Sequence, residues 1–302
     1  MKNRLLNWFY YCAGLLFLFL AKVRNWLKGY TPKTFSMDDL ERCVHYDIHV
    51  VDEWLACLNK YTESDAANSL KNKNILELGP GSDLGIGLYL LSKSIQNYFA
   101  VDVYDLANNV SERFYEVFFS FLRKSGFADT ERLAVELKMT QQGNSKRLNY
   151  ICREDFDIVK ALSPHTVDFI FSNAAFEHFN DVHKTIEAIS NVASSDAIFI
   201  ALVDLKTHSR WIRDKDPDNI YRYPDWLYQW FRTRSIPNRV RPYQYEEALK
   251  KNEWKNIAIY AATELNDHQF DRVKNHLNKK FRDYKNQMKY LSVWICATRR
   301  MG

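Results

Sequence analysis

Apolar and polar positions repeat along most of the chain with two different periods, one typical of strands and one typical of helices. Five apolar runs are as long as a typical buried strand. They lie at residues 74–79, 98–103, 148–152, 167–172 and 197–205. Between them, apolar residues recur at three- and four-residue spacings, which predicts helices through about residue 95, over 108–124 and over 181–193. Because strands and helices alternate, we expect a parallel sheet covered by helices on both faces.

The segments on either side of this alternation complete the predicted fold. Ser36 precedes apolar positions at helical spacing, which predicts a helix over about 37–61 beside the sheet. Near the end of the chain, apolar runs at 257–265 and 290–298 flank a basic stretch that predicts a helix over about 268–288. We expect the two runs to close the sheet as an antiparallel pair. The predicted fold class is therefore α/β, with a doubly wound sheet of seven strands.

The N-terminal segment carries a different pattern. Leu5 to Ala21 holds no charged residue over seventeen positions, which is the short edge of what crosses a bilayer as a helix. Basic residues stand on both sides, up to Lys33, and aromatic residues lie near both ends, as in interfacial belts. We interpret 1–33 as a hydrophobic membrane anchor of unresolved orientation and 34–302 as the main domain. A buried core helix and a cleaved signal peptide are the alternatives.

Composition and charge narrow the class of protein. With 46% hydrophobic and 26% charged residues, the 302-residue chain is neither disordered nor a disulfide-rich mini-protein. Its five cysteines form no CxxC pair, which argues against a zinc knuckle and favours reduced thiols in the cytoplasm. The net charge of +5 is uneven, because basic segments at both ends flank an acidic centre. This distribution favours an anionic partner or a membrane surface at the periphery.

A glycine turn follows the first strand of the sheet. The segment Ile75–Gly81 leads a strand into a turn that opens a helix, where main chain approaches a ligand closely. A dinucleotide fingerprint needs glycine at its sixth position, and Leu84 stands there, which disfavours NAD. Glu77 before the turn and Asp102 at the end of the next strand are placed to accept the two hydroxyls of a ribose. The pattern indicates a nucleoside ligand without phosphates.

In these features the chain resembles the class I S-adenosylmethionine-dependent methyltransferases, over about residues 74–299, and this implies their Rossmann-like sheet. Residues 152–157 are similar to the segment that contacts adenine, with Asp155 the first candidate and Asp157 the second. Residues 167–179 resemble the motif that lies beside the reactive methyl group. The resemblance implies S-adenosylmethionine as cofactor, with ten candidate binding residues: Glu77, Gly79, Pro80, Gly81, Asp102, Val103, Asp155, Phe156, Ser172 and Asn173.

A closer resemblance, carried by residues 204–208 and 238–245, is to bacterial members associated with surface-polysaccharide gene clusters. It implies methyl transfer to a hydroxyl, or else an amine, of an anionic or lipid-linked glycan intermediate. The expected location is the cytoplasmic face of the inner membrane, with the cytoplasm as the alternative. Two other functions stay open. One is a catalytically silent subunit of a membrane glycan-assembly complex, and the other is a small-molecule methyltransferase that needs no anchor.

Methyl transfer from a sulfonium is an in-line displacement, in which positioning does most of the work and only a protonated acceptor needs a base. His178 and His208 are the two candidate bases, because a neutral imidazole suits that task near pH 7. Glu177 with a nearby histidine is a minor candidate for a divalent cation, as in some related oxygen methyltransferases. His45 and His49 lie four residues apart, but no fourth ligand is evident. We therefore expect no metal.

An insertion, residues 206–241, follows the fifth strand and combines aromatic residues with nine basic residues and four aspartates. We interpret it as a substrate lid, in which aromatic faces stack on a sugar or isoprenoid and arginines clamp a phosphate or carboxylate. A packed subdomain with solvated arginines is the alternative. No RNA-binding module accompanies the insertion, so no nucleic-acid partner is expected. The predicted substrate-binding residues are Glu177, Arg239, Arg241 and Tyr243.

Overall fold

The computed structural model describes residues 2–29 and 39–299, so the first residues of the helix predicted over 37–61 and the end of the 1–33 segment lie outside the described residues. A seven-stranded sheet with the order β3-β2-β1-β4-β5-β7-β6 forms the centre. Its strands are β1 Asn74–Leu78, β2 Asn97–Asp102, β3 Leu148–Cys152, β4 Val167–Asn173, β5 Ala193–Asp204, β6 Lys255–Glu264 and β7 Tyr290–Thr298. β7 runs antiparallel to β5 and β6, and the pairs from β3 to β5 are parallel. The predicted fold is confirmed.

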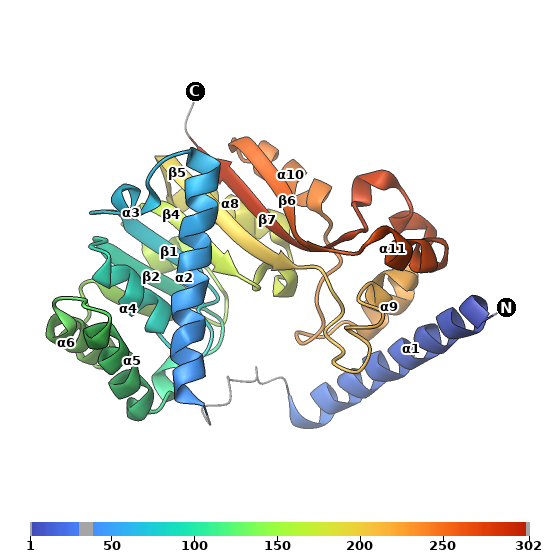
Figure 1. The fold of residues 1–302 in the computed structure, drawn as a ribbon, viewed down its shortest axis with the longest axis horizontal. Coiled ribbons are helices and arrows are strands. Elements are labelled where there is room, and N and C mark those ends of the chain that lie inside the picture. The colour runs from blue at the N-terminus through green and yellow to red at the C-terminus, as the bar shows by residue number, and fades with distance from the viewer. Residues whose placement is uncertain (1, 30–38, 300–302) are drawn as a thin grey trace.

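Helices cover both faces of the sheet (Figure 1). One face carries α2 Leu40–Thr62, with α3 Ala66–Ser69 after it, α4 Gly85–Ser92, α5 Glu112–Lys124 and α6 Thr130–Gln141. The other face carries α7 Ile158–Leu162, α8 Val182–Val192 and α10 Pro242–Lys251. Each face has its own apolar core, and on the first the Trp54 ring stacks on Phe171 at 4.8 Å between centroids. The doubly wound arrangement places the carboxyl ends of the parallel strands at one edge, where α/β proteins bind ligands.

Two helical segments differ from the sequence-based expectation. α6 was not predicted, although it packs beside α4 and α5. The continuous helix predicted over 268–288 is wrong, because the structure has α11 Asp267–Val273 followed by short 3-10 turns at Lys274–His276, Lys279–Phe281 and Tyr284–Asn286. Tertiary contacts break this helix. The main-chain carbonyls of Asn286 and Gln287 accept hydrogen bonds from Arg241, and Phe281 is buried in a third apolar core.

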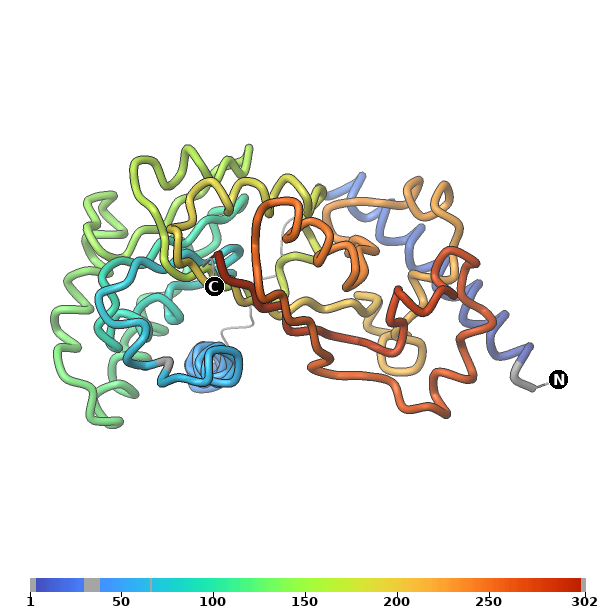
Figure 2. The backbone as a smooth tube through the Cα atoms, turned by 90° about the horizontal axis from the view of Figure 1, so that it is seen from above, coloured from blue at the N-terminus to red at the C-terminus, as the bar shows by residue number. Residues whose placement is uncertain are grey.

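α1, Lys2–Lys28, lies along the insertion on the side of the molecule away from α6 (Figures 1 and 2). The insertion holds a 3-10 turn, Asn219–Arg222, and α9, Asp225–Phe231. At the closest point, a Cβ on Gly14 would lie 1.9 Å from Oδ1 of Asn219 and 2.1 Å from the hydroxyl of Tyr223. Only glycine permits this approach. The side chains of Asn219 and Tyr223 then donate hydrogen bonds to the carbonyls of Tyr10 and Tyr11.

The opposite face of α1 is exposed and apolar. Its exposed side chains include Leu5, Trp8, Phe9, Leu16, Phe19, Leu20, Trp26 and Leu27. Within the part of the chain that the structure describes, α1 is long and apolar enough to cross a membrane, and 17% of its apolar window is buried against the protein. The side that faces the insertion is also apolar and includes Leu15, Leu18 and Ala21.

Candidate active site

The turn after β1 adopts a backbone that requires glycine at two positions. Gly79 has φ +73° and Gly81 has φ +81°, in the left-handed region that side chains disfavour. A Cβ on Gly79 would also lie 2.8 Å from the Cβ of Ala175, so the turn packs closely on the segment after β4. α4 begins four residues later, where the Asp83 carboxylate accepts a hydrogen bond of 2.9 Å from the amide of Gly85.

A cavity of about 840 Å³, here called the strand-end cavity, opens at the carboxyl ends of β1, β2 and β4. Gly79, Gly81 and Asp102 line it on one side and Phe156 and His178 on the other. Main-chain amides orient Asp102, because its Oδ1 accepts hydrogen bonds of 2.6 Å from Val103 and 3.0 Å from Tyr104. The volume is within the roughly 300–1,000 Å³ typical of small-molecule sites.

The loop after β3 contributes a charged wall to this cavity. Arg153 binds both carboxylate oxygens of Asp155, at 2.9 and 2.8 Å, and lowers the pKa of Asp155 to about 2. Asp157 caps α7 by accepting a hydrogen bond of 3.0 Å from the amide of Lys160. Phe156 stands between them with a left-handed φ of +50°, and all three residues 155–157 line the cavity. Asp155 is therefore ionised, and its charge is balanced by Arg153.

A second cavity, of about 630 Å³ and here called the α1 cavity, lies between α1 and the insertion. α1 supplies an apolar wall that includes Phe17, Leu18 and Ala21. Exposed cations stand along the same cavity, namely Arg24, Lys28 and Arg210. His178 lines both this cavity and the strand-end cavity, so the two cavities adjoin at this residue.

Three chemically reactive side chains converge where the cavities meet. Glu177 and His178 follow β4, His208 follows β5, and the two imidazole centroids are 4.9 Å apart. Burial raises the pKa of Glu177 to about 8 and lowers the pKa of His178. Burial and the neighbouring His178 lower the pKa of His208 to about 4. Both histidines are therefore neutral near pH 7, as a base or a metal ligand must be.

Comparisons with known proteins identify the class of enzyme. A family model described as a methyltransferase domain matches residues 48–259 of the chain. The chain belongs to this family. It is an S-adenosylmethionine-dependent methyltransferase, in agreement with the fold and with the turn after β1. A comparison with curated proteins found no match.

Solved structures of methyltransferases were also found. Phosphoethanolamine N-methyltransferase 2 of Haemonchus contortus, solved with S-adenosylmethionine, shares 15% identity at a TM-score of 0.45, over 83% of this chain and 53% of that one. A putative sarcosine dimethylglycine methyltransferase of Galdieria sulphuraria shares 14% identity at a TM-score of 0.41, over 83% and 85%. A putative S-adenosylmethionine-dependent methyltransferase of Listeria monocytogenes shares 14% identity at a TM-score of 0.40, over 82% of this chain and 99% of that one. The chain spans about half the length of the first.

Beside the turn after β1, the methyltransferase buries three acidic side chains. Asp47 of α2, Glu77 of β1 and Asp83 of the turn form a buried group, here called the carboxyl cluster. Burial raises the pKa of all three, to about 8 for Glu77, and Asp83 raises the pKa of Asp47 further. A Cβ on Gly85 would lie 2.0 Å from Oδ2 of Asp47, so the helix start packs directly on the cluster. Burial favours the protonated, neutral form of these acids, and the strand-end cavity is lined by other residues.

The structure brings together most of the candidate cofactor residues of the methyltransferase and separates others. Those that line the strand-end cavity are Gly79, Gly81, Asp102, Val103, Asp155 and Phe156. Glu77 does not line this cavity, since its side chain is 1% exposed and accepts a hydrogen bond from Tyr98. Ser172 is fully buried and donates to the carbonyl of Leu78. Pro80 and Asn173 do not line the cavity, and Asn173 donates to the Tyr46 hydroxyl at 3.0 Å.

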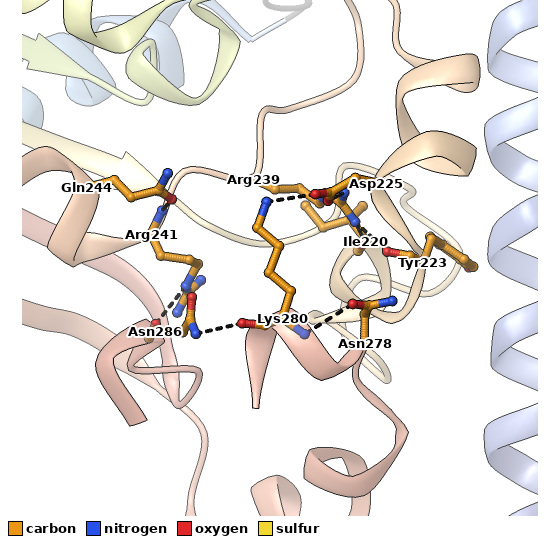
Figure 3. Close-up of polar contacts among 9 residues, drawn as sticks. All are labelled: Ile220, Tyr223, Asp225, Arg239, Arg241, Gln244, Asn278, Lys280 and Asn286. Atoms are coloured by element: carbon orange, nitrogen blue, oxygen red, sulfur yellow. Dashed lines mark hydrogen bonds and ion pairs between the residues drawn. The ribbon is translucent and has the colours of Figure 1, made fainter. Parts of the chain in front are cut away.

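Two arginines expected to bind substrate have structural roles instead (Figure 3). Arg241 is fully buried, and its guanidinium donates to the carbonyls of Asn286, Gln287 and Tyr290. Arg239 donates to two carbonyls of the insertion and pairs with Asp225. Arg241 donates four hydrogen bonds to protein oxygens and Arg239 donates three, and neither residue lines the strand-end cavity or the α1 cavity. Tyr243 lies at the start of α10, where its ring faces Lys285 and lines neither cavity.

Sequence reasoning missed two contributors to the site. Arg234 of the insertion lines the strand-end cavity and donates to the hydroxyl of Tyr104 at 3.1 Å, so the insertion reaches over this cavity. α1 was interpreted as an anchor alone, yet it forms a wall of the α1 cavity. One signal pointed to this second role. Gly14 interrupts an otherwise bulky apolar helix, and such a glycine often marks close packing against another segment.

Proposed function

We propose that this methyltransferase transfers a methyl group from S-adenosylmethionine to a hydroxyl of an anionic, lipid-linked glycan intermediate at the cytoplasmic face of the inner membrane. One observation carries the proposal: His178 borders both cavities. An acceptor held in the α1 cavity and a cofactor held in the strand-end cavity meet at this residue. Such alignment supplies much of the barrier reduction in a displacement reaction.

The strand-end cavity is the proposed cofactor site. Gly79 and Gly81 allow the main chain to approach the ligand, and Asp102 is oriented by amides so that it can accept from ribose hydroxyls. Val103, Asp155 and Phe156 complete the wall. Bound there, the cofactor supplies an electrophilic methyl group. The protein's part is to align the acceptor oxygen behind that carbon, exclude water and remove the hydroxyl proton.

The α1 cavity combines the features that an anionic, lipid-linked acceptor needs. The apolar wall of α1 suits an isoprenoid chain, and Arg24, Lys28 and Arg210 suit a phosphate. Trp211, 80% exposed, stands at the same cavity with a free ring face for a sugar. A hydroxyl of that sugar would then point toward His178. In this proposal Trp211 and Arg210 of the predicted lid bind the acceptor together with α1, and Arg239 and Arg241 do not.

Membrane attachment follows from the exposed face of α1. One side of the helix packs on the insertion, so α1 lies along the protein and turns its other side outward. A helix in this arrangement suits the membrane interface, with its apolar face in the acyl region and cations near the headgroups. Segment 1–33 then serves as the attachment, residues 34–302 form the methyltransferase domain, and a lipid-linked acceptor enters the α1 cavity from the bilayer.

The test uses the full-length protein bound to phospholipid vesicles, labelled S-adenosylmethionine, and either extracted membrane lipids or soluble sugars and phenols as acceptors. We expect label in the lipid extract, in a fraction from which mild acid releases a methylated glycan. Leu16→Ser/Phe19→Ser should reduce this labelling at least tenfold, because it weakens membrane attachment, and Val135→Ser on α6 is the matched control. Equal labelling of a soluble acceptor by both variants would instead establish a small-molecule methyltransferase.

A further inference from the structure

Glu177, His178 and His208 form a group with the geometry of a metal site. One potential ligand atom from each lies within 4.8 Å of those of the other two. Ligand atoms of a tetrahedral ion with bonds of about 2.1 Å stand roughly 3.3 Å apart, so a contraction of about 1.5 Å at most completes the site. The residues come from two different strand ends, after β4 and after β5. The fold, and not a local sequence motif, therefore assembles the group.

Each of the three side chains has a buried atom without a hydrogen-bond partner among the described residues, namely Glu177 Oε2, His178 Nδ1 and His208 Nε2. Main-chain groups at Asp204 and Arg234 stand close to the Glu177 carboxyl group and the His178 imidazole, respectively. Contacts of this kind orient metal ligands. Glu177 is 2% exposed, and an unpaired buried carboxylate oxygen is costly without a cation.

We propose that Glu177, His178 and His208 bind one divalent transition-metal ion, preferably Zn²⁺, and that its open position takes the acceptor hydroxyl. Two imidazoles and a carboxylate are ligands of first-row transition metals, whereas Mg²⁺ and Ca²⁺ prefer oxygen alone. Three protein ligands leave the fourth position for water or substrate, as in catalytic zinc sites. This proposal departs from the sequence-based expectation of no metal. His45 and His49 are both exposed and lie outside the cluster.

The role assigned to the ion rests on the proposed function, whereas its binding does not. Because His178 lines both cavities, an ion held by it would stand between acceptor and cofactor. A cation lowers the pKa of a coordinated hydroxyl, whose proton passes to solvent water. The oxygen then forms a bond to the methyl carbon as the carbon–sulfur bond breaks. The electron pair of that bond goes to sulfur, which leaves as neutral S-adenosylhomocysteine.

Metal binding is measured first, without any acceptor. Chelator-treated full-length protein in detergent is titrated with Zn²⁺ by calorimetry and with Co²⁺ by visible absorption. We expect one ion per chain and a Co²⁺ spectrum typical of low coordination number. His208→Gln and Glu177→Gln should each weaken binding at least 100-fold, and His49→Gln, an exposed histidine on α2, should leave it unchanged. If Glu177→Gln does not fold, His208→Gln decides the matter, because the His208 side chain is 23% exposed.

Failure of this site and failure of the proposed function give different results. A wild-type protein that binds neither Zn²⁺ nor Co²⁺, or His208→Gln that binds both normally, overturns the site. With binding established, chelation should reduce methyl transfer at least 100-fold, leave S-adenosylhomocysteine affinity unchanged, and be reversed by Zn²⁺. Full transfer to lipid by the metal-free protein overturns the role of the ion and supports histidine as base. If the protein binds the ion but methylates no lipid, the proposed function is wrong and the metal site is still supported.

Discussion

The strand-end cavity and the α1 cavity share His178 in their walls, yet the buried ionisable side chains near them differ, with acids near the first and arginines held by protein oxygens near the second. Near the strand-end cavity, the carboxyl cluster consists of three acids whose pKa values burial raises. Beside the α1 cavity, Arg222 and Arg241 are buried cations, and each is satisfied by oxygens of the protein itself. In the first region burial favours the protonated, neutral form of the acids. In the second, oxygens of the protein itself pair with the arginines, so the fold sets the shape of this region.

The difference also concerns how each region is built. The strand-end cavity depends on main-chain geometry at strand ends, supported by apolar cores on both faces of the sheet. The region around the α1 cavity depends on polar contacts between segments far apart in sequence, such as the bonds from Arg241 to Asn286 and from Asn219 to Tyr10. We therefore expect the strand-end cavity to tolerate substitutions around it. The region around the α1 cavity should lose its shape when one partner of a buried polar contact is removed.

The largest expected effect concerns the carboxyl cluster and pH. Glu77 has a pKa of about 8 in the folded protein against an ordinary value of 4.5, so the folded state holds a proton that the unfolded state has lost between these values. Stability contributed by this proton is complete below pH 4.5 and disappears as pH rises to 8, by up to about 5 kcal/mol. Denaturant unfolding of the cofactor-free protein between pH 5 and 8 measures this loss.

Glu77→Gln is the control for the pH effect, since an amide keeps the shape of the side chain and does not titrate in this range. The stability of the variant should rise relative to wild type as pH increases from 5 to 8. The remaining slope reports Asp47 and Asp83, whose raised pKa values act in the same direction. Parallel pH profiles for the two proteins would show that Glu77 does not hold this proton.

The second-largest expected effect is on stability and concerns the buried arginines. Arg222 binds both oxygens of Asp216, at 2.9 and 2.7 Å, and both side chains are almost fully buried. Arg222→Met leaves an uncompensated buried carboxylate, which should lower the unfolding free energy by about 3–5 kcal/mol. Arg222→Met/Asp216→Asn should recover part of this loss, and Lys215→Met, an exposed neighbour, should have almost no effect. Thermal unfolding of the three variants in detergent checks these expectations. Equal stability of Arg222→Met and Lys215→Met would show that the buried ion pair does not support this region.

A smaller effect is expected at the strand-end cavity itself. Asp102→Ala removes the carboxylate proposed for the ribose hydroxyls, and the loss of such charge-assisted hydrogen bonds costs about 1–3 kcal/mol. Calorimetric titration of S-adenosylhomocysteine should therefore show affinity reduced roughly 5- to 150-fold. Asp196→Ala, on the exposed start of β5, is the matched control. Unchanged affinity in a folded Asp102→Ala protein would move the cofactor site away from this cavity.

The sequence predicts the strand-end region well because its signals are local. A buried strand, the glycine turn and an acid at the next strand end are each visible within a few residues, and the topology brings them together. The sequence does not show which of these side chains face the cavity and which are buried. Glu77 and Ser172 precede the cavity residues Gly79 and Ala174 by two positions, but both side chains are buried. Glu77 accepts a hydrogen bond from Tyr98, and Ser172 donates one to the carbonyl of Leu78.

Around the α1 cavity, residue type alone misled the prediction. An arginine that clamps a phosphate and an arginine that holds a loop have the same sequence pattern, and Arg241 is distinguished only by contacts 45 to 49 residues away. The same contacts end the helical run predicted over 268–288. Likewise, Glu177, His178 and His208 become one group only when β4 and β5 lie side by side. Long-range polar contacts depend on the tertiary fold and produce no periodic pattern in the amino-acid sequence.

The smallest effect tests whether the two regions are coupled at all. Arg234 of the insertion donates to the Tyr104 hydroxyl and lies over its ring, 5.9 Å from the centroid, beside the strand-end cavity. Both groups are near solvent, so the contact is worth about 0.5 kcal/mol and its loss should weaken S-adenosylhomocysteine binding only about twofold. Arg234→Ala, Tyr104→Phe and the double variant form a cycle. A combined effect no larger than either single one shows that the insertion closes over the cofactor, and strict additivity shows that it does not.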